Sequence, residues 1–248
     1  MSDNSHSSKS AIVGHDSLKD AVLCHIPFSL FAVSLSLICV SILTYIGEDP
    51  VLGALKAGRL FHSLHFMHLL FAGTGVILTY RKYSKSVIGS LLVGVFVPTV
   101  FCTLSDAIIP YWGGKLANLD MVFHWCFIDH IFTVLPFLGA GLLNGWVISL
   151  HSENKHMFYS TWSHFAHIFI SSMASIFYLV SYGFEKWYDH FGFVFIFLII
   201  AVIVPCTLSD LVVPMLCANK GSKKGKGIEN EMVENLGCCN SGNKDEKH

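Results

Sequence analysis

Charged residues are scarce in this chain. Asp, Glu, Lys and Arg make up only 13% of its 248 residues, whereas an ordinary soluble domain contains about 25%, and 53% of the residues are apolar. This composition indicates one integral membrane domain rather than a soluble fold. The formal net charge is −1, and the basic residues fall in short loops and in the tail. The sequence therefore argues against a nucleic-acid partner.

Several familiar chemical motifs are also missing. The sequence contains no Gly-rich phosphate loop, no Ser-His-Asp arrangement and no Cys-x-x-Cys pair. Its eight cysteines lie mostly in apolar runs without the paired loop spacing of a disulfide framework, so we expect them to be reduced. Residues 1–20 form a polar segment that does not resemble a cleaved signal peptide. Residues 218–248 are expected to form a disordered tail.

Six apolar stretches are long enough to cross a bilayer as helices, which takes about 20 residues each. We therefore predict an all-α, polytopic membrane protein with six transmembrane helices in contact with lipid. The predicted helices cover residues 21–46, 59–80, 87–110, 121–150, 157–182 and 189–217. The connection between the third and fourth helices is expected at Trp112-Gly113-Gly114, because paired glycines favour turns.

The basic residues predict the orientation of these helices. The second connection contains Arg81, Lys82 and Lys85, the fourth contains Lys155, and the tail is rich in lysine. The odd-numbered connections carry fewer cations. Because cytoplasmic loops carry an excess of Lys and Arg, both termini are predicted to lie in the cytoplasm.

One polar segment occurs twice within these apolar helices. Cys102-Thr-Leu-Ser-Asp106 returns unchanged as Cys206-Thr-Leu-Ser-Asp210. An Asp within the membrane costs on the order of 2.5–3.5 kcal/mol, so a sequence that carries it twice in the same context is expected to use it.

The repeat extends to histidine, of which the chain has 14. Span 2 contains His65-Phe-Met-His68 and span 5 contains His164-Phe-Ala-His167. The i, i+3 spacing of these H-x-x-H pairs puts both rings of a pair on one helix face.

The first span of each half adds one further histidine, His25 in span 1 and His130 in span 4. Each half contains three spans, an odd number, so the second half enters the membrane from the opposite side. The sequence thus predicts two inverted repeats, residues 21–110 and residues 111–217.

Depth along the helices predicts which of these groups meet. One cluster is expected near the outer face and the other near the cytoplasmic face, each with a histidine from the opposite half. Their predicted metal ligands are His65, His68, Asp106 and His130 in the first cluster, and His164, His167, Asp210 and His25 in the second. His62 and His124 are expected to assist a cation or to form interfacial hydrogen bonds rather than to act as core ligands.

Three imidazoles and a carboxylate suit a divalent transition metal such as zinc, iron, copper, cobalt or nickel. Magnesium and calcium would favour more carboxylates. Cys102 and Cys206 share the helix face of their Asp, and the sequence leaves open whether they are ligands.

Three functions fit these residues. We favour a transporter or channel for a transition-metal ion over an enzyme, with a site near each membrane face and a possible homo-oligomeric state. One alternative is an electron-transfer protein with two b-type haems, which explains neither the second His of each pair nor the Asp. Another is a metal-dependent oxygenase or hydrolase. A di-metal centre needs its ions about 3.5–4 Å apart, closer than the predicted clusters.

Overall fold

The computed structural model describes residues 26–43, 50–150, 153–184 and 187–221, and these residues form helices without any strand. The first helix is Ile26–Leu43. The other α-helices are α2 (Pro50–Tyr83), α3 (Val87–Thr103), α4 (Ile109–Leu116), α5 (Cys126–Asp129), α6 (Ile131–Ser149), α7 (Glu153–Ser181), α8 (Phe191–Leu198), α9 (Val204–Thr207) and α10 (Val213–Gly221). The predictions for residues 1–20, for His25 and for the end of the tail concern positions outside the described residues.

Six helical segments are long and apolar enough to cross a membrane, which confirms the predicted all-helical architecture and indicates a membrane protein. These candidate spans are Ile26–Leu43, Lys56–Tyr83, Val87–Leu116, Ile131–Ser149, Ser163–Ser181 and Trp187–Ala218. Large apolar side chains cover their outer surface: Ile88 is 74% exposed and Phe132 is 90% exposed. Exposed apolar helices of this kind match the hydrocarbon core of a bilayer.

Two predicted boundaries in the middle of the chain are wrong. Trp112-Gly113-Gly114 lies inside α4 instead of forming a connection, so the third span continues to Leu116. The fourth span begins only at Ile131, because residues 121–125 are not helical. The amide of Val122 donates to the carbonyl of Tyr182 (3.1 Å), which holds this segment against the end of α7.

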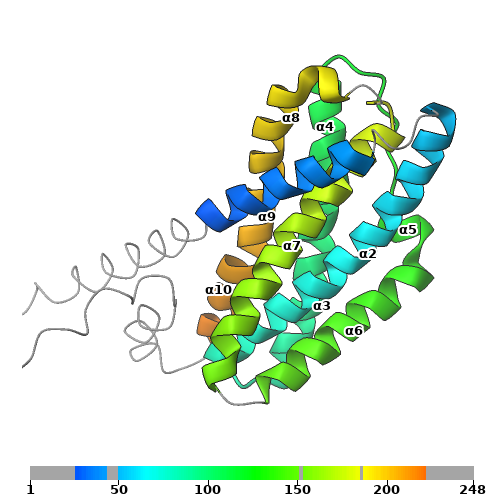
Figure 1. Cartoon of the computed structure of the whole chain (residues 1–248). Coiled ribbons are helices and arrows are strands. Elements are labelled where there is room, and N and C mark those ends of the chain that lie inside the picture. The colour runs from blue at the N-terminus through cyan, green and yellow to red at the C-terminus, as the bar shows by residue number, and fades with distance from the viewer. Residues whose placement is uncertain (1–25, 44–49, 151–152, 185–186, 222–248) are drawn as a thin grey trace, which may run out of the picture.

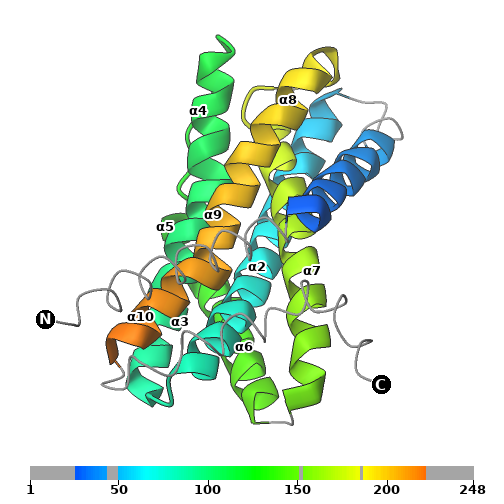
Figure 2. The same cartoon turned by 90° about the vertical axis from the view of Figure 1, so that its left-hand side faces the viewer.

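Helices α2 and α7 form the centre of the bundle and lie side by side (Figure 1). Within the span Ser163–Ser181 of α7, 67% of an 18-residue stretch is buried, against 22% of an 18-residue stretch of the span Ile131–Ser149 of α6. Helix α6 packs closely on α2 because Gly141 lacks a side chain: a Cβ there would lie 2.3 Å from the carbonyl oxygen of Leu70. The first helix crosses the bundle obliquely (Figures 1 and 2). Its Phe31 stacks on Phe165 of α7.

The two copies of the repeated segment share an unusual backbone. Leu104–Ile108 and Leu208–Val212 are both π-helical turns, and the sixth span contains a further π-helical turn at Ile199–Ile203. Pro110 and Pro214 follow the two turns, and a proline cannot donate to the carbonyl four residues earlier, here that of Asp106 and of Asp210. Single π-helical turns are rare and frequently occur at functional sites.

Candidate metal centre

Asp106 accepts hydrogen bonds from both histidines of its H-x-x-H pair. His65 Nδ1 lies 2.9 Å and His68 Nδ1 lies 2.7 Å from the Oδ2 atom of Asp106. The other oxygen, Oδ1, accepts from the hydroxyls of Ser105 (2.8 Å) and Ser171 (2.7 Å). All five residues are fully buried. The carboxylate is therefore held from α2, from α7 and from its own π-helical turn.

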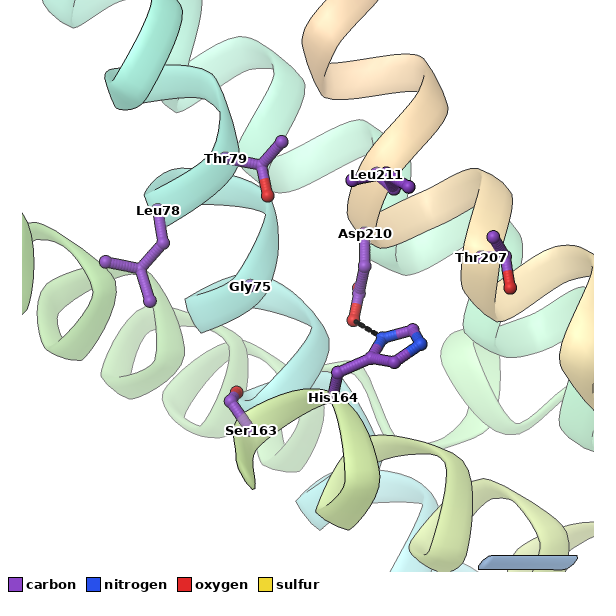
Figure 3. Close-up of a pocket in the computed structure, with 8 residues that line it drawn as sticks. All are labelled: Gly75, Leu78, Thr79, Ser163, His164, Thr207, Asp210 and Leu211. Atoms are coloured by element: carbon purple, nitrogen blue, oxygen red, sulfur yellow. Dashed lines mark hydrogen bonds and ion pairs between the residues drawn. The ribbon is translucent and has the colours of Figure 1, made fainter. Parts of the chain in front are cut away.

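Asp210 forms the same arrangement with the second pair. His167 Nδ1 lies 2.6 Å and His164 Nδ1 lies 3.2 Å from its Oδ2 atom (Figure 3 shows the bond to His164). No described residue hydrogen-bonds its Oδ1 atom. In each half the structure thus brings the predicted H-x-x-H pair and Asp together, while their role as metal ligands stays a prediction.

These contacts define which nitrogen of each ring can bind a metal. An ionised carboxylate only accepts hydrogen bonds, so the Nδ1 atoms facing it are donors and each neutral ring keeps a lone pair on Nε2. The Nε2 atoms of His65 and His167 are buried, and no described residue hydrogen-bonds them. A carboxylate that orients an imidazole in this way is the usual support of a metal-binding histidine. Asp106 and Asp210 can therefore act beside a metal without touching it.

The predicted separation of the two clusters is wrong. The rings of His68 and His167 are only 4.4 Å apart between centroids, so the clusters meet inside the bundle instead of lying near opposite faces. The error comes from the helix boundaries: α2 has 34 residues and α7 has 29, which puts both H-x-x-H pairs near the middle of their helices.

Two cysteines lie where the clusters meet. The Sγ atoms of Cys102 and Cys206 are 3.5 Å and 3.8 Å from His68 Nε2. The donor atoms of His68, His167 and Cys206 all lie within 4.8 Å of one another. A tetrahedral zinc ion with nitrogen at about 2.05 Å and sulfur at about 2.3 Å separates the two atoms by about 3.6 Å. These three residues could hold a metal ion, with Cys102 beside them as a candidate fourth ligand.

The predicted position of His130 in the Asp106 cluster is wrong. Its ring lies 4.6 Å from that of His62 and 5.9 Å from that of His124, and these three histidines form a separate group. His130 directly precedes α6, so it reaches the level of His62, about one helical turn before His65. The sequence assigned His62 and His124 only an assisting role, and nothing in their spacing predicted this group.

The His124 imidazole and the Tyr182 phenol are both in their neutral forms at neutral pH. Partial burial lowers the pKa of His124, and the nearby His130 lowers it further, against the opposing effect of Asp129. The ring of Tyr182 stacks on that of His124, and burial raises the pKa of the Tyr182 phenol to about 12. His124 is therefore in its metal-binding form under ordinary conditions.

A cavity of about 40 Å³ reaches the second cluster. It is lined by Gly75, Leu78, Thr79, Ser163, His164, Thr207, Asp210 and Leu211 (Figure 3). A volume of this size has room for a few water molecules. The Asp210 cluster is thus accessible to small polar species, whereas Asp106 is completely enclosed.

Six candidate membrane spans that enclose buried His, Cys and Asp side chains define a helical membrane protein with groups that could bind a metal ion. Comparison of the chain with protein-family models, with curated proteins and with solved structures finds no match. The functional conclusion therefore rests on the site itself.

Proposed function

We propose that this protein transports a divalent transition-metal ion across a membrane, through one central site built by both halves of the chain. The observation that carries the proposal is the meeting of His68 from α2, His167 from α7 and Cys206 from α9. This single site replaces the two stations near opposite faces that the sequence predicted.

Internal symmetry supports a transporter. Each half contributes an H-x-x-H pair, an Asp that orients it, and a Cys from a segment that leads into a π-helical turn. On the proposed topology, residues 21–110 and 111–217 are inverted repeats. Transporters with inverted repeats bind their substrates near the bilayer midplane, between interrupted helices. The interruptions at Leu104 and Leu208 lie next to the proposed site.

The donor atoms support a transition metal over an alkaline-earth ion. Imidazole and thiolate suit zinc, iron, cobalt or copper, whereas magnesium and calcium favour oxygen. Only neutral imidazole and thiolate bind metal, so loading the site must release protons. In our proposal Asp106 and Asp210 orient the imidazoles, instead of binding the ion as the sequence predicted.

The cavity supports a direction of access. Its lining includes Leu78 and Thr79, which precede Arg81 near the end of α2 that the positive-inside pattern places in the cytoplasm. The described conformation would therefore be accessible from the cytoplasm and sealed on the other side.

The two alternative functions fit the geometry less well. Imidazoles on opposite faces of one haem iron have ring centroids roughly 6 Å apart, if each nitrogen is about 2 Å from the iron. The 4.4 Å between His68 and His167 leaves no room for a porphyrin. The contact of the clusters removes the distance argument against a di-metal enzyme, but the cavity of about 40 Å³ is far below the ~300 Å³ or more of an organic-substrate pocket.

Metal flux into proteoliposomes tests the proposal. The purified chain should move zinc or cobalt into vesicles, and Cys206→Ser and His167→Ala should each abolish this flux. His190→Ala is the matched control, because His190 is exposed and lies outside the His/Cys/Asp groups described above. Wild-type vesicles that take up none of the transition metals, or a Cys206→Ser chain with full flux, would contradict the proposal.

A further inference from the structure

We propose that His62, His124 and His130 form a second metal site, which exchanges its ion with water at the end of the bundle opposite the cavity. Along α2, at about 1.5 Å per residue, His62 is about 9 Å from His68 of the central site and about 20 Å from the cavity residue Gly75. The three histidines form a group that shares no residue with the central site or with the cavity.

The neighbours of His62 and His124 favour the same tautomer for both rings. His62 Nδ1 hydrogen-bonds the backbone carbonyl oxygen of Gly58 (2.6 Å). His124 Nδ1 lies 3.2 Å from the Oδ2 atom of Asp129 in an ion-pair contact. A carbonyl and a carboxylate only accept protons, so Nδ1 is the protonated nitrogen beside each of them and each neutral ring keeps its lone pair on Nε2. Backbone carbonyls and carboxylates support metal-binding histidines in this way.

The two lone pairs face each other. The Nε2 atoms of His62 and His124 are 3.0 Å apart. Two lone pairs at this distance repel unless a proton or a metal ion lies between the rings. Two nitrogens bound to one tetrahedral zinc at about 2.05 Å are about 3.3 Å apart, so a shift of a few tenths of an ångström would accommodate the ion.

His124 is held in place while His130 has freedom to adjust. The backbone amide of His124 donates to the Tyr178 hydroxyl (3.3 Å), and its ring stacks on Tyr182. His130 is exposed, and one of its ring nitrogens lies within 4.8 Å of the donor atoms of the other two histidines. Its side chain can therefore turn toward the ion without disturbing the core.

The donor set determines how this site would behave. Three imidazoles leave one position of a tetrahedral ion open to water, as in sites that exchange ligands, whereas the central site is buried and includes sulfur. We infer that the ion binds here first and then moves inward. This role rests on the proposed transport function, but binding at the three histidines does not.

Cobalt titration of the full chain in detergent separates the two sites. Tetrahedral cobalt(II) absorbs visible light, and a cysteine ligand adds a sulfur-to-cobalt charge-transfer band. The wild-type chain should bind two ions. His124→Gln should bind one ion and keep the sulfur band, whereas a His167→Ala/Cys206→Ser chain should bind one ion without that band. His190→Ala, at the same end of the bundle, should bind two.

The outcomes of this titration are distinguishable. If His62 and His124 only share a proton, His124→Gln will bind as many cobalt ions as the wild type, and the second site is ruled out. A His167→Ala/Cys206→Ser chain that is folded, as shown by circular dichroism, but binds no cobalt would also overturn it. If that chain still binds one ion while wild-type vesicles transport none, the three-histidine site stands and the transport function fails.

Asp129→Asn tests the support of His124 without removing a ligand. The Asp129 side chain is 52% exposed, so its replacement should leave the unfolding temperature unchanged. Loss of a supporting carboxylate should weaken cobalt affinity at this site about tenfold. Unchanged affinity in competition with a chelator would contradict the role of Asp129 in setting the tautomer of His124.

Discussion

The two copies of the Cys-Thr-Leu-Ser-Asp segment have the same type of backbone turn, and each Asp has an equivalent pair of histidine partners. Their surroundings differ. Asp106 accepts four hydrogen bonds and is completely buried. Among the described residues, two imidazoles alone donate hydrogen bonds to Asp210, which is 7% exposed and borders a cavity. The repeated motif therefore sets the pairing of groups, while residues outside it decide whether the cluster is sealed.

Those deciding residues lie on the helix that faces each Asp. Ser171 of α7 donates to Asp106, and its counterpart at the same distance from the H-x-x-H pair of α2 is Ala72, which has no hydroxyl. Gly75 of α2 faces Asp210 closely: a Cβ there would lie 3.2 Å from the carboxylate. If the protein is a transporter as proposed, Asp106 marks the closed side and Asp210 the open side of one transport conformation.

Replacing each Asp by Ala should give the largest difference in unfolding free energy between the two clusters. Asp106→Ala removes the acceptor of two imidazole N–H groups and of the Ser171 and Ser105 hydroxyls, of which Ser105 can still donate to the carbonyl of Cys102 (3.2 Å). Each group that stays unpaired costs about 1–3 kcal/mol. We expect a loss of several kcal/mol, roughly 3–5 kcal/mol for a buried charged partner. Asp210→Ala should cost clearly less, because water can reach the groups it leaves. Denaturant unfolding of the purified variants measures both losses, and equal losses would contradict the contrast.

Removing one hydroxyl should have an intermediate effect. Ser171→Ala deletes the bond to Asp106 Oδ1 (2.7 Å) together with the longer contacts of this hydroxyl with Ser105 Oγ (3.3 Å) and Cys206 Sγ (3.6 Å). It should lower the free energy of unfolding by about 1 kcal/mol. The neighbouring Ser172 is a matched control, since it is equally buried but its hydroxyl donates to the carbonyl of Ile168 in its own helix (2.8 Å). Ser172→Ala should be close to neutral in the same unfolding experiment. If Ser172→Ala costs as much as Ser171→Ala, the bond to Asp106 has no special role.

Adding one methyl group beside Asp210 tests whether the cavity there is the open side of the site. Gly75→Ala places a Cβ against Asp210 and narrows the cavity, while Ala favours the helix by about 1 kcal/mol. We expect slower metal flux with little change in stability. Gly139→Ala is the control, because a Cβ at Gly139 meets nothing within 4 Å. Flux reduced equally in both variants would point to a general effect of helix stiffness instead.

Lowering the pH should have the smallest effect on stability. This test concerns the group formed by His62, His124 and His130. The pKa of His124 is lowered in the folded chain, so the unfolded chain binds more protons as the pH falls through about 6.5. Stability should therefore decline slightly below this pH, and His124→Gln should remove part of the decline. His62, His130, Asp129 and Tyr182 surround this ring, so the variant must be compared with His190→Ala. An identical pH dependence in both would contradict the lowered pKa.

The sequence predicted the architecture and the pairing of groups better than their depth. Hydropathy identified six spans, and the H-x-x-H and Asp repeat correctly paired His65 and His68 with Asp106, and His164 and His167 with Asp210. The meeting of the clusters was missed because α2 begins at Pro50, in residues too weakly apolar to be assigned to a span. An error of about one helical turn in the predicted depth of His130 put it beside His65 instead of His62.

Other features depend on contacts that spacing alone does not reveal. The approach of Cys102 and Cys206 to His68 depends on how two distant spans pack, although their repetition four residues before each Asp was a signal. The π-helical turns depend on the hydrogen-bond register of the backbone, and the prolines after them were the only indication in the sequence.

X-ray absorption spectroscopy of the protein loaded with one equivalent of zinc, in the His124→Gln background, tests the central claim most directly. The account predicts a mixed first shell with sulfur at about 2.3 Å and nitrogen at about 2.0–2.1 Å, and a smaller sulfur contribution after Cys206→Ser. A shell of nitrogen and oxygen alone, unchanged by Cys206→Ser, would contradict a central site formed by His68, His167 and Cys206.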